Sequence, residues 1–181
     1  MLMYDNVYQR CHDTMSMDVL GDKFSNYPSQ EKVATLLIEQ GIRVEGGKAY
    51  SGPIVQSDSA IGRACGVDRR VVRATLERIS STPELDAIFS KLKCTLSMVD
   101  LAPEIGCSSI IITPTDSTMP GILAEIMDVL YKAGISVRQA MVDDSGNVNT
   151  ATLVVVVFGK LPANVLPELK SCRGVASILI K

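Results

Sequence analysis

The chain has 181 residues, which is enough for one large domain or two small ones. Its apolar content of 46% can fill buried cores, and its formal charge of −2 excludes a uniformly basic nucleic-acid coat, so any basic patch must be local. With 4% aromatic residues and no Trp, the chain is not expected to present platforms on which bases stack.

Cysteine usage and hydropathy indicate a cytoplasmic protein. The five cysteines are odd in number, widely scattered and without a CxxC pair, which is typical of reduced thiols. Only Cys11-His12 approaches zinc-ligand spacing, so we expect no metal and no cofactor. The amino terminus lacks a signal-peptide pattern, and the longest apolar run, Leu153 to Phe158, is too short to span a bilayer.

The first fifty residues indicate a helical start followed by a hairpin. Residues 1–28 are rich in Met, and their apolar side chains recur at i,i+4 spacing, which fits either a packing helix or a loose arm. Residues 29–41 carry apolar side chains at helical spacing. The sequence Glu45-Gly46-Gly47 between two short apolar segments predicts a hairpin or wing-like strand.

Residues 57–80 read SDSAIGRACGVDRRVVRATLERIS and predict two short helices joined by a tight turn. Ser57 or Ser59 can cap the first helix, Gly66 breaks it, and Asp68 can cap the second. The segment resembles a helix-turn-helix of the type Ala-x-x-x-Gly-Val-[Ser/Asp], with residues 29–41 as the third helix. The resemblance implies a winged-helix-like amino-terminal domain that contacts duplex DNA.

The charge of this segment supports DNA contact locally, because five arginines stand against three acidic residues, giving +2. The first residues of a recognition helix reach base edges or phosphates, which arginine binds through its bidentate fork. The candidate DNA-binding residues are Arg63, Arg69, Arg70 and Arg73. The alternative is that they form a solvated basic face on a packing helix.

Residues 82–107 are interpreted as a connector, with a helix from Pro83 to about Lys93 and then a strand or loop to Cys107. The expected domains are therefore residues 1–81, the connector 82–107, and a second domain over 108–181. In that second domain the apolar periodicity and the turn residues predict strands near 110–112, 135–142, 150–158 and 175–180, helices over 120–133 and 163–172, and a turn at 143–147. This βαββαβ order is ferredoxin-like and gives an α+β fold class.

Residues 116–137 read DSTMPGILAEIMDVLYKAGISV, an Asp-containing loop followed by Pro-Gly, an amphipathic helix, a Gly and a strand. Pro120 suits a first helical position, and Gly121 lets a ligand approach the positive end of the helix. The pattern resembles the DxPGxL(x)nGI entry of the ACT domain, although three residues separate Asp116 from Pro120 where that family usually has one.

In the ACT family this loop binds the regulatory amino acid, so the resemblance implies a ligand site at the same loop. The candidate ligand-binding residues are Asp116, Ser117, Thr118, Met119, Pro120, Gly121, Ile122 and Leu123. Asp116 is expected to pair with the ammonium group of the ligand, and the helix start to receive its carboxylate. The alternative is that Pro-Gly only shapes the turn between strand and helix.

The strands of the second domain do not alternate apolar and polar residues; Leu153 to Phe158 and Ile110 to Ile112 are continuous apolar runs. The sheet face away from the helices therefore needs a cover, either a second copy of the chain or the first domain. ACT modules commonly pair, which implies a dimer or higher oligomer. The alternative is a monomer with a few exposed valines.

The sequence shows no catalytic triad, no nucleotide-binding loop and no paired carboxylates for acid–base work. We therefore expect that the chain is not an enzyme and has no catalytic residue. The two resemblances imply a prokaryotic, archaeal-type, amino-acid-responsive regulator of transcription or metabolism. Its expected partners are a second copy of the chain, an amino acid and duplex DNA, and no membrane association is expected. The alternative is an ACT-type regulatory subunit that docks on a biosynthetic enzyme without binding DNA. A third possibility is an ACT module used only for assembly.

Overall fold

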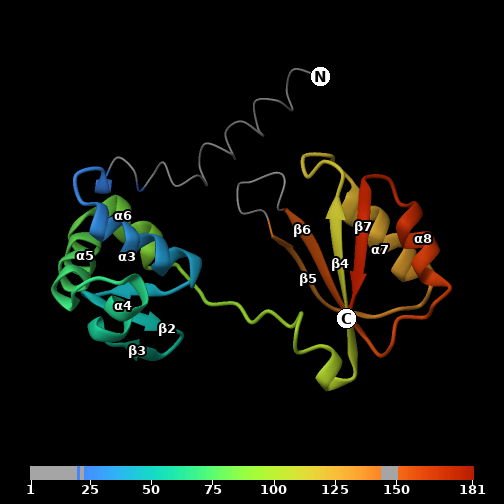
Figure 1. Cartoon of the computed structure of the whole chain (residues 1–181), viewed down its shortest axis with the longest axis horizontal. Helices are drawn as coiled ribbons and strands as arrows, with labels where there is room; N and C mark the ends of the chain where they lie inside the picture. The colour runs from blue at the N-terminus through green and yellow to red at the C-terminus, as the bar shows by residue number, and fades with distance from the viewer. Residues whose placement is uncertain (1–19, 21–22, 144–150) are drawn as a thin grey trace, which may run out of the picture. The chain divides into compact units, whose positions relative to one another are not determined.

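The computed structural model describes residues 20, 23–143 and 151–181. The chain divides into two compact units, residues 1–95 and 96–181 (Figure 1). Most of the segment 1–28, for which a packing helix or a loose arm was expected, lies outside the described residues. So do Cys11-His12 and most of the predicted turn at 143–147. In the described part of the chain, no helix combines the length and the apolar character needed to cross a bilayer.

From Pro28 onward, the first unit consists of a helix, a small antiparallel sheet and three further helices. In chain order these are α3 (Pro28–Glu39), β1 (Arg43–Glu45), β2 (Lys48–Ser51), β3 (Ile54–Gln56), α4 (Asp58–Cys65), α5 (Arg69–Ser81) and α6 (Pro83–Phe89). The strands lie in the order β1-β2-β3. The helix near 29–41 and the hairpin around Gly46-Gly47 were expected, whereas β3 was not, because its three residues show too little periodicity.

The core of this unit forms from the apolar faces of α3, α5 and α6, with Leu37, Leu76, Ile79, Leu85 and Phe89 all fully buried. Leu85 and Phe89 belong to α6, so the first part of the predicted connector packs into this core. The helix ends at Phe89 rather than near Lys93. The segment 82–107 is thus divided between the two units at residue 95.

The second unit has the order β4 (Cys107–Pro114), α7 (Ile122–Lys132), β5 (Val137–Asp143), β6 (Thr152–Phe158), α8 (Val165–Ser171) and β7 (Val175–Ile180), preceded by the 3-10 turn η1 (Pro103–Ile105). The sheet order is β5-β6-β4-β7, and every neighbouring pair is antiparallel. This is the expected βαββαβ arrangement. Pro167 occupies the third residue of α8, where its missing N–H would have no intrahelical partner anyway.

Helices α7 and α8 lie on one face of this sheet (Figure 1), where Ile126 and Leu130 of α7 pack with Leu169 of α8 in one buried cluster. Ile110, Ile112, Leu153, Val155 and Val157 are the strand residues of the same cluster. Because side chains alternate across a strand, Val154 and Val156 point to the opposite face. Both are nevertheless buried, which explains why β6 shows no apolar–polar alternation.

Part of the opposite face is covered by the chain itself. Met98 and Ala102 pack on Val156 and Cys107. The Gln139 side chain accepts a 2.9 Å hydrogen bond from the Met98 amide and donates a 2.6 Å bond to the Leu96 carbonyl. Residues 96–106, which we call the strap, therefore supply some of the cover that the sequence had assigned to a partner chain or to the first domain.

Candidate functional sites

The loop that leads into α7 is ordered by its own aspartate. The Asp116 Oδ1 atom accepts hydrogen bonds from the Thr118 amide at 2.9 Å and from the Thr118 hydroxyl at 2.6 Å. These two bonds stabilise the carboxylate and hold the pKa of Asp116 below its ordinary value. One of the two carboxylate oxygens of Asp116, a predicted ligand-binding residue, is therefore already occupied by Thr118.

The helix begins two residues later than the sequence predicted. Pro120 precedes the cap rather than filling the first helical position, and Gly121 is the N-cap, with φ of 95°. Its carbonyl accepts the Glu125 amide at 3.0 Å, which closes the first turn. No side chain of the described residues caps α7. The N–H groups at its start are thus left for solvent or a ligand.

A second segment borders the loop, and sequence reasoning missed it. The Thr115 amide donates to the Gly174 carbonyl at 2.8 Å. A Cβ atom on Gly174 would lie 2.9 Å from the Ile122 side chain and 3.0 Å from the Met119 sulfur. This close approach, together with φ of 83°, favours a glycine at position 174. The turn 172–174 therefore forms one wall of the site.

Arg173 of this turn is bound to the first turn of α7. Its amide donates to Glu125 Oε2 at 2.8 Å, and its Nη2 atom lies 3.2 Å from Glu125 Oε1. Neither residue was a sequence candidate. Arg173 lies about fifty residues from the loop in the sequence, and no linear periodicity joins the two segments, so only the pairing of β7 with β4 brings them together.

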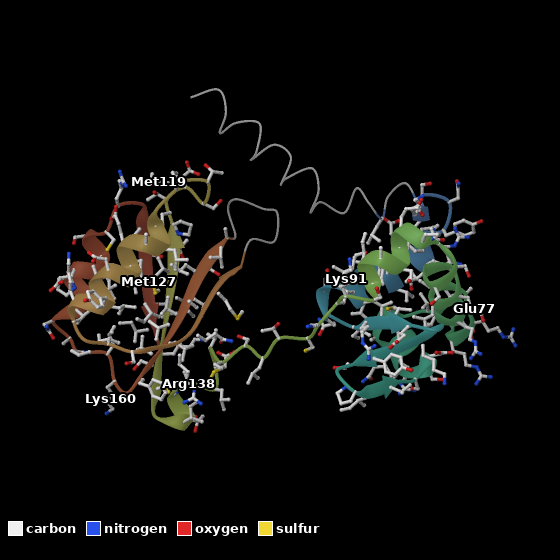
Figure 2. The ribbon with its side chains drawn as sticks, turned by 180° about the vertical axis from the view of Figure 1, so that it is seen from behind. Glu77, Lys91, Met119, Met127, Arg138 and Lys160 are labelled. Atoms are coloured by element: carbon white, nitrogen blue, oxygen red, sulfur yellow. The ribbon has the colours of Figure 1, made fainter. Side chains whose placement is uncertain are left out.

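The structure brings some of the eight predicted ligand residues together and leaves others apart. Met119, Gly121 and Ile122 lie against the turn 172–174, and Figure 2 shows Met119 in the loop that leads into α7. Asp116 and Thr118 bind each other. Ser117 is half-buried, Pro120 is exposed, and Leu123 is 41% exposed.

In the first unit, α4 and α5 are joined by a tight turn whose caps agree with the sequence. Ser57 Oγ accepts the Ala60 amide at 3.2 Å, and Asp68 Oδ1 accepts the Arg70 amide at 2.8 Å. Gly66 adopts a left-handed conformation with φ of 66°. The Val67 amide donates to the Gly62 carbonyl at 2.9 Å, and a Cβ atom on Gly62 would lie 2.8 Å from the Val67 oxygen. The turn thus packs directly on the α4 backbone.

The four arginine candidates are all exposed but differ in their partners. Arg73 lies 3.5 Å from Asp58 and 3.4 Å from Glu77, so its charge is largely balanced. Arg63, Arg69 and Arg70 form no salt bridge with any residue of the described ranges. A fifth arginine, Arg78, lies over the Tyr27 ring at 3.8 Å and contributes to packing with the amino-terminal side of α3.

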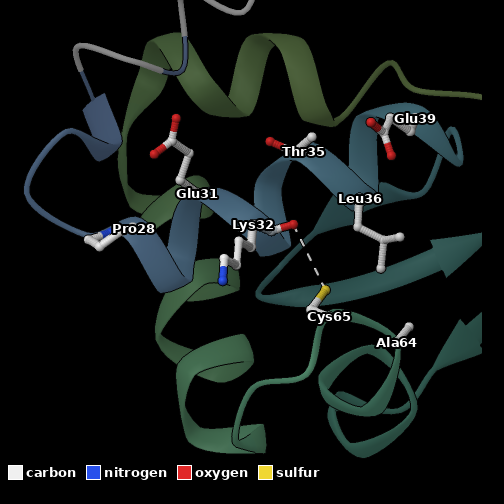
Figure 3. A pocket seen from close by; sticks show the side chains of 8 residues that line it. All are labelled: Pro28, Glu31, Lys32, Thr35, Leu36, Glu39, Ala64 and Cys65. Carbon is white, nitrogen blue, oxygen red and sulfur yellow. Dashed lines mark hydrogen bonds between the residues drawn. The ribbon is translucent and has the colours of Figure 1, made fainter.

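Described residues of the first unit line two of the pockets of the chain. One of about 350 Å³ is bordered by the β1–β2 turn and the Arg73–Glu77 side of α5. The other, of about 470 Å³, lies between α3 and the end of α4 (Figure 3). In it the Cys65 thiol donates to the Lys32 carbonyl at 3.9 Å, and burial raises the pKa of that thiol, which disfavours the reactive thiolate. Among the described residues, His, Cys, Asp and Glu form no group suited to a metal ion.

No protein-family model and no curated protein matches the sequence. Among solved structures, the ligand-free regulatory subunit of aspartate kinase from Thermus thermophilus aligns with 42% of this chain and 51% of its own, at 17% identity and a TM-score of 0.36. This chain thus spans about half the length of that protein. A transcriptional regulator from Neisseria meningitidis, in complex with L-Met, aligns with 84% of this chain and 86% of its own, at 14% identity and a TM-score of 0.27. TM-scores this low establish no shared fold, so any function must be argued from this chain's own residues.

Proposed function

We propose that the chain is a non-enzymatic, amino-acid-responsive regulator that binds a small amino acid through its second unit and duplex DNA through its first. The observation that carries this proposal is the start of α7, where an uncapped helix end opens beside Arg173 and the Asp116 loop. An uncapped helix start favours a carboxylate, because its unpaired N–H groups and the helix dipole both point toward the ligand.

The α4–α5 pair is proposed to be a helix-turn-helix, with α5 as the recognition helix. The proposal is supported by the two caps, by the left-handed Gly66 and by the close approach of the turn to Gly62. Arg69 and Arg70 occupy the first turn of α5 with their charges unbalanced by described neighbours, which is where such helices contact phosphates and bases. Arg73 contributes less, because Asp58 and Glu77 must be displaced before it can bind a phosphate.

Self-association is proposed through the part of the second sheet that the strap leaves open. There, the register aligns Met141, Val154, Ile111 and Leu179 across all four strands. Leu179 is 55% exposed, and Ile111 and Met141 are half-buried, so a second copy can bury this row further. Burying apolar surface stabilises by roughly 25 cal/mol per Å², which favours pairing of two such rows.

One observation favours the alternative, a regulatory subunit that docks on an enzyme without binding DNA. Arg73, one of the four arginines that the sequence assigned to DNA, is paired with Asp58 and Glu77. While these salt bridges persist, one guanidinium group fewer is free to bind a phosphate. Measured affinity for DNA therefore separates the two functions.

The test of DNA binding is a mobility-shift titration of the full chain on random duplex DNA over a range of salt concentrations. Specific and non-specific complexes both release counterions, so phosphate contacts appear as a slope of log affinity against log salt. Arg70→Ala should lower that slope by about one unit, while Arg73→Ala should lower it by less. Absence of binding at low salt would reject the DNA-binding role and leave the docking subunit.

The test of ligand binding is a thermal-shift screen of the common L-amino acids, since a ligand that binds the native state raises the melting temperature. A substitution at Gly121 would be a poor probe of the site. Its φ of 95° strains any other residue, so lost binding and lost folding would be confused. Arg173 is the better choice, because its side chain is 72% exposed.

A further inference from the structure

One row of side chains on the second sheet holds the strap. The row lies on the face away from the helices, and backbone pairing aligns its members in the order Gln139, Val156, Ser109 and Lys181, the last of which directly follows β7. The attachments are the two Gln139 bonds to Leu96 and Met98, the packing of Met98 and Ala102 on Val156, a 2.9 Å bond from the Ser109 hydroxyl to the Val99 carbonyl, and a 2.7 Å salt bridge from Lys181 Nζ to Asp100. All four positions of the row are thus used to hold one segment.

The strap itself is weakly buried. Ala102 is its one buried residue, Met98 and Val99 are half-buried, and the other residues from 96 to 106 are exposed. The strap adds no strand to the sheet, and its only regular element is the turn η1. Segments with few buried apolar contacts open at a lower free energy than core strands do. The strap can therefore detach while β4 and β6 stay folded.

Detachment uncovers surface that continues the row proposed for self-association, which we call the open row (Met141, Val154, Ile111 and Leu179). Beneath the strap, Val156 is fully buried and Cys107 is 7% exposed. Val154 and Val156 are two residues apart on one strand, so they share a face and their rows are neighbours. A second copy of the chain that covers both rows must take the place of the strap.

We propose that the strap is a releasable cover that competes with a second copy of the chain for this face of the sheet. With the strap closed, only the open row is available for pairing, and with the strap detached the row that contains Val156 is available as well. Leu96 follows directly on Thr95, the last residue of the first unit, so detachment also lengthens the free connection between the units. This inference rests on the proposed self-association and identifies the element that controls it.

Alkylation of Cys107 under native conditions measures detachment, because this thiol lies beneath the strap. The full chain is treated with iodoacetamide, and the peptide that contains Cys107 is quantified by mass, separately from the other cysteines. Met98→Ala removes apolar packing and Gln139→Ala removes two hydrogen bonds, so each should raise the labelling rate roughly tenfold or more. Leu96→Ala is the matched control on the strap and should label as the wild type, because its side chain is 66% exposed and Gln139 binds only its carbonyl.

Sedimentation equilibrium of the same proteins tests the competition. A binding-competent state that is only fractionally populated lowers the apparent affinity by that fraction, so a tenfold rise in the detached state should lower the dissociation constant of the dimer about tenfold or more. Met98→Ala is the variant for this measurement, because it leaves every residue of the sheet unchanged. Leu96→Ala should associate as the wild type does.

Hydrogen exchange of the β6 amides separates detachment of the strap from unfolding of the sheet. The inference requires that Cys107 gain reactivity in Met98→Ala while these amides keep their wild-type protection. A parallel loss of both protections, or no gain at Cys107 in either variant, would overturn it. If Cys107 gains reactivity and the dissociation constant does not fall, the self-association stands but the competition is wrong. If neither the wild type nor Met98→Ala associates, the proposed self-association is wrong, and this inference falls with it.

Discussion

Gly41 provides a sharp test of how the chain leaves the first unit. It follows α3 with φ of 60°, and a Cβ atom there would clash with the Lys93 carbonyl and lie 2.8 Å from the Cys94 nitrogen. Both contacts are backbone atoms, which cannot rotate away as a side-chain tip could. Gly41→Ala must therefore displace the segment near residues 93–94 that carries the chain toward the second unit.

The magnitude follows from two separate costs. A left-handed conformation costs a residue other than glycine about 1–2 kcal/mol. Forcing a methyl group into a filled space costs typically about 1–3 kcal/mol more. Gly46→Ala is the matched control, since Gly46 has φ of 56° and a methyl group there would meet no described atom within 4 Å. The control incurs only the first cost, so Gly41→Ala should destabilise the first unit by about 1–3 kcal/mol more.

Hydrogen exchange followed by peptide mass is the suitable assay, because it reports each unit separately. A single melting curve would mix two units that need not unfold together. In a unit of this size, each kcal/mol corresponds to about 4–8 °C in melting temperature. Amides of α3 and α5 should lose more protection in Gly41→Ala than in Gly46→Ala, while those of β4 and β6 should not change. Equal losses in the two variants would refute the close approach of residues 93–94.

Three further substitutions test other parts of the structure. Gly62→Ala should destabilise the first unit despite a gain of up to about 1 kcal/mol in helix propensity, because the methyl group meets the Val67 carbonyl at 2.8 Å; a rise in the unfolding free energy would contradict this. Thr118→Ala should raise the pKa of Asp116 toward its ordinary value, because the hydroxyl bond to the carboxylate is lost. Carboxyl NMR titrations of the wild type and Thr118→Ala measure this change, with Thr118→Ser, which keeps the hydroxyl, as the control. The wild-type loop is stabilised by the ionised carboxylate, since the folded pKa lies below the unfolded one, and that stabilisation is lost as pH falls through the folded value. Leu179→Asp should abolish self-association, measured by sedimentation, without unfolding the monomer, because Leu179 is 55% exposed in one copy. The control Val142→Asp changes a 64% exposed residue on the helix-bearing face and should leave self-association intact.

The sequence alone determined the features that depend on neighbouring residues. Helical spacing located α3, α5 and α7. Capping chemistry placed the start of α4 at Ser57 or Ser59 and that of α5 at Asp68, because an N-cap side chain binds an amide two or three residues away, and the structure selects Ser57 for α4. The order of apolar segments in residues 108–181 predicted βαββαβ. The continuous apolar run in β6 correctly indicated a strand buried on both faces.

Only the tertiary structure decided the features that join distant segments. The strap over Val156, the balancing of Arg73 by Asp58 and Glu77, and the Glu125–Arg173 pair each depend on contacts for which the linear pattern carries no signal. The left-handed conformation of Gly121 likewise places the start of α7 after Pro120, in a loop that lies against the turn 172–174. Local periodicity specifies which face of an element is apolar, but the partner of that face is chosen by packing.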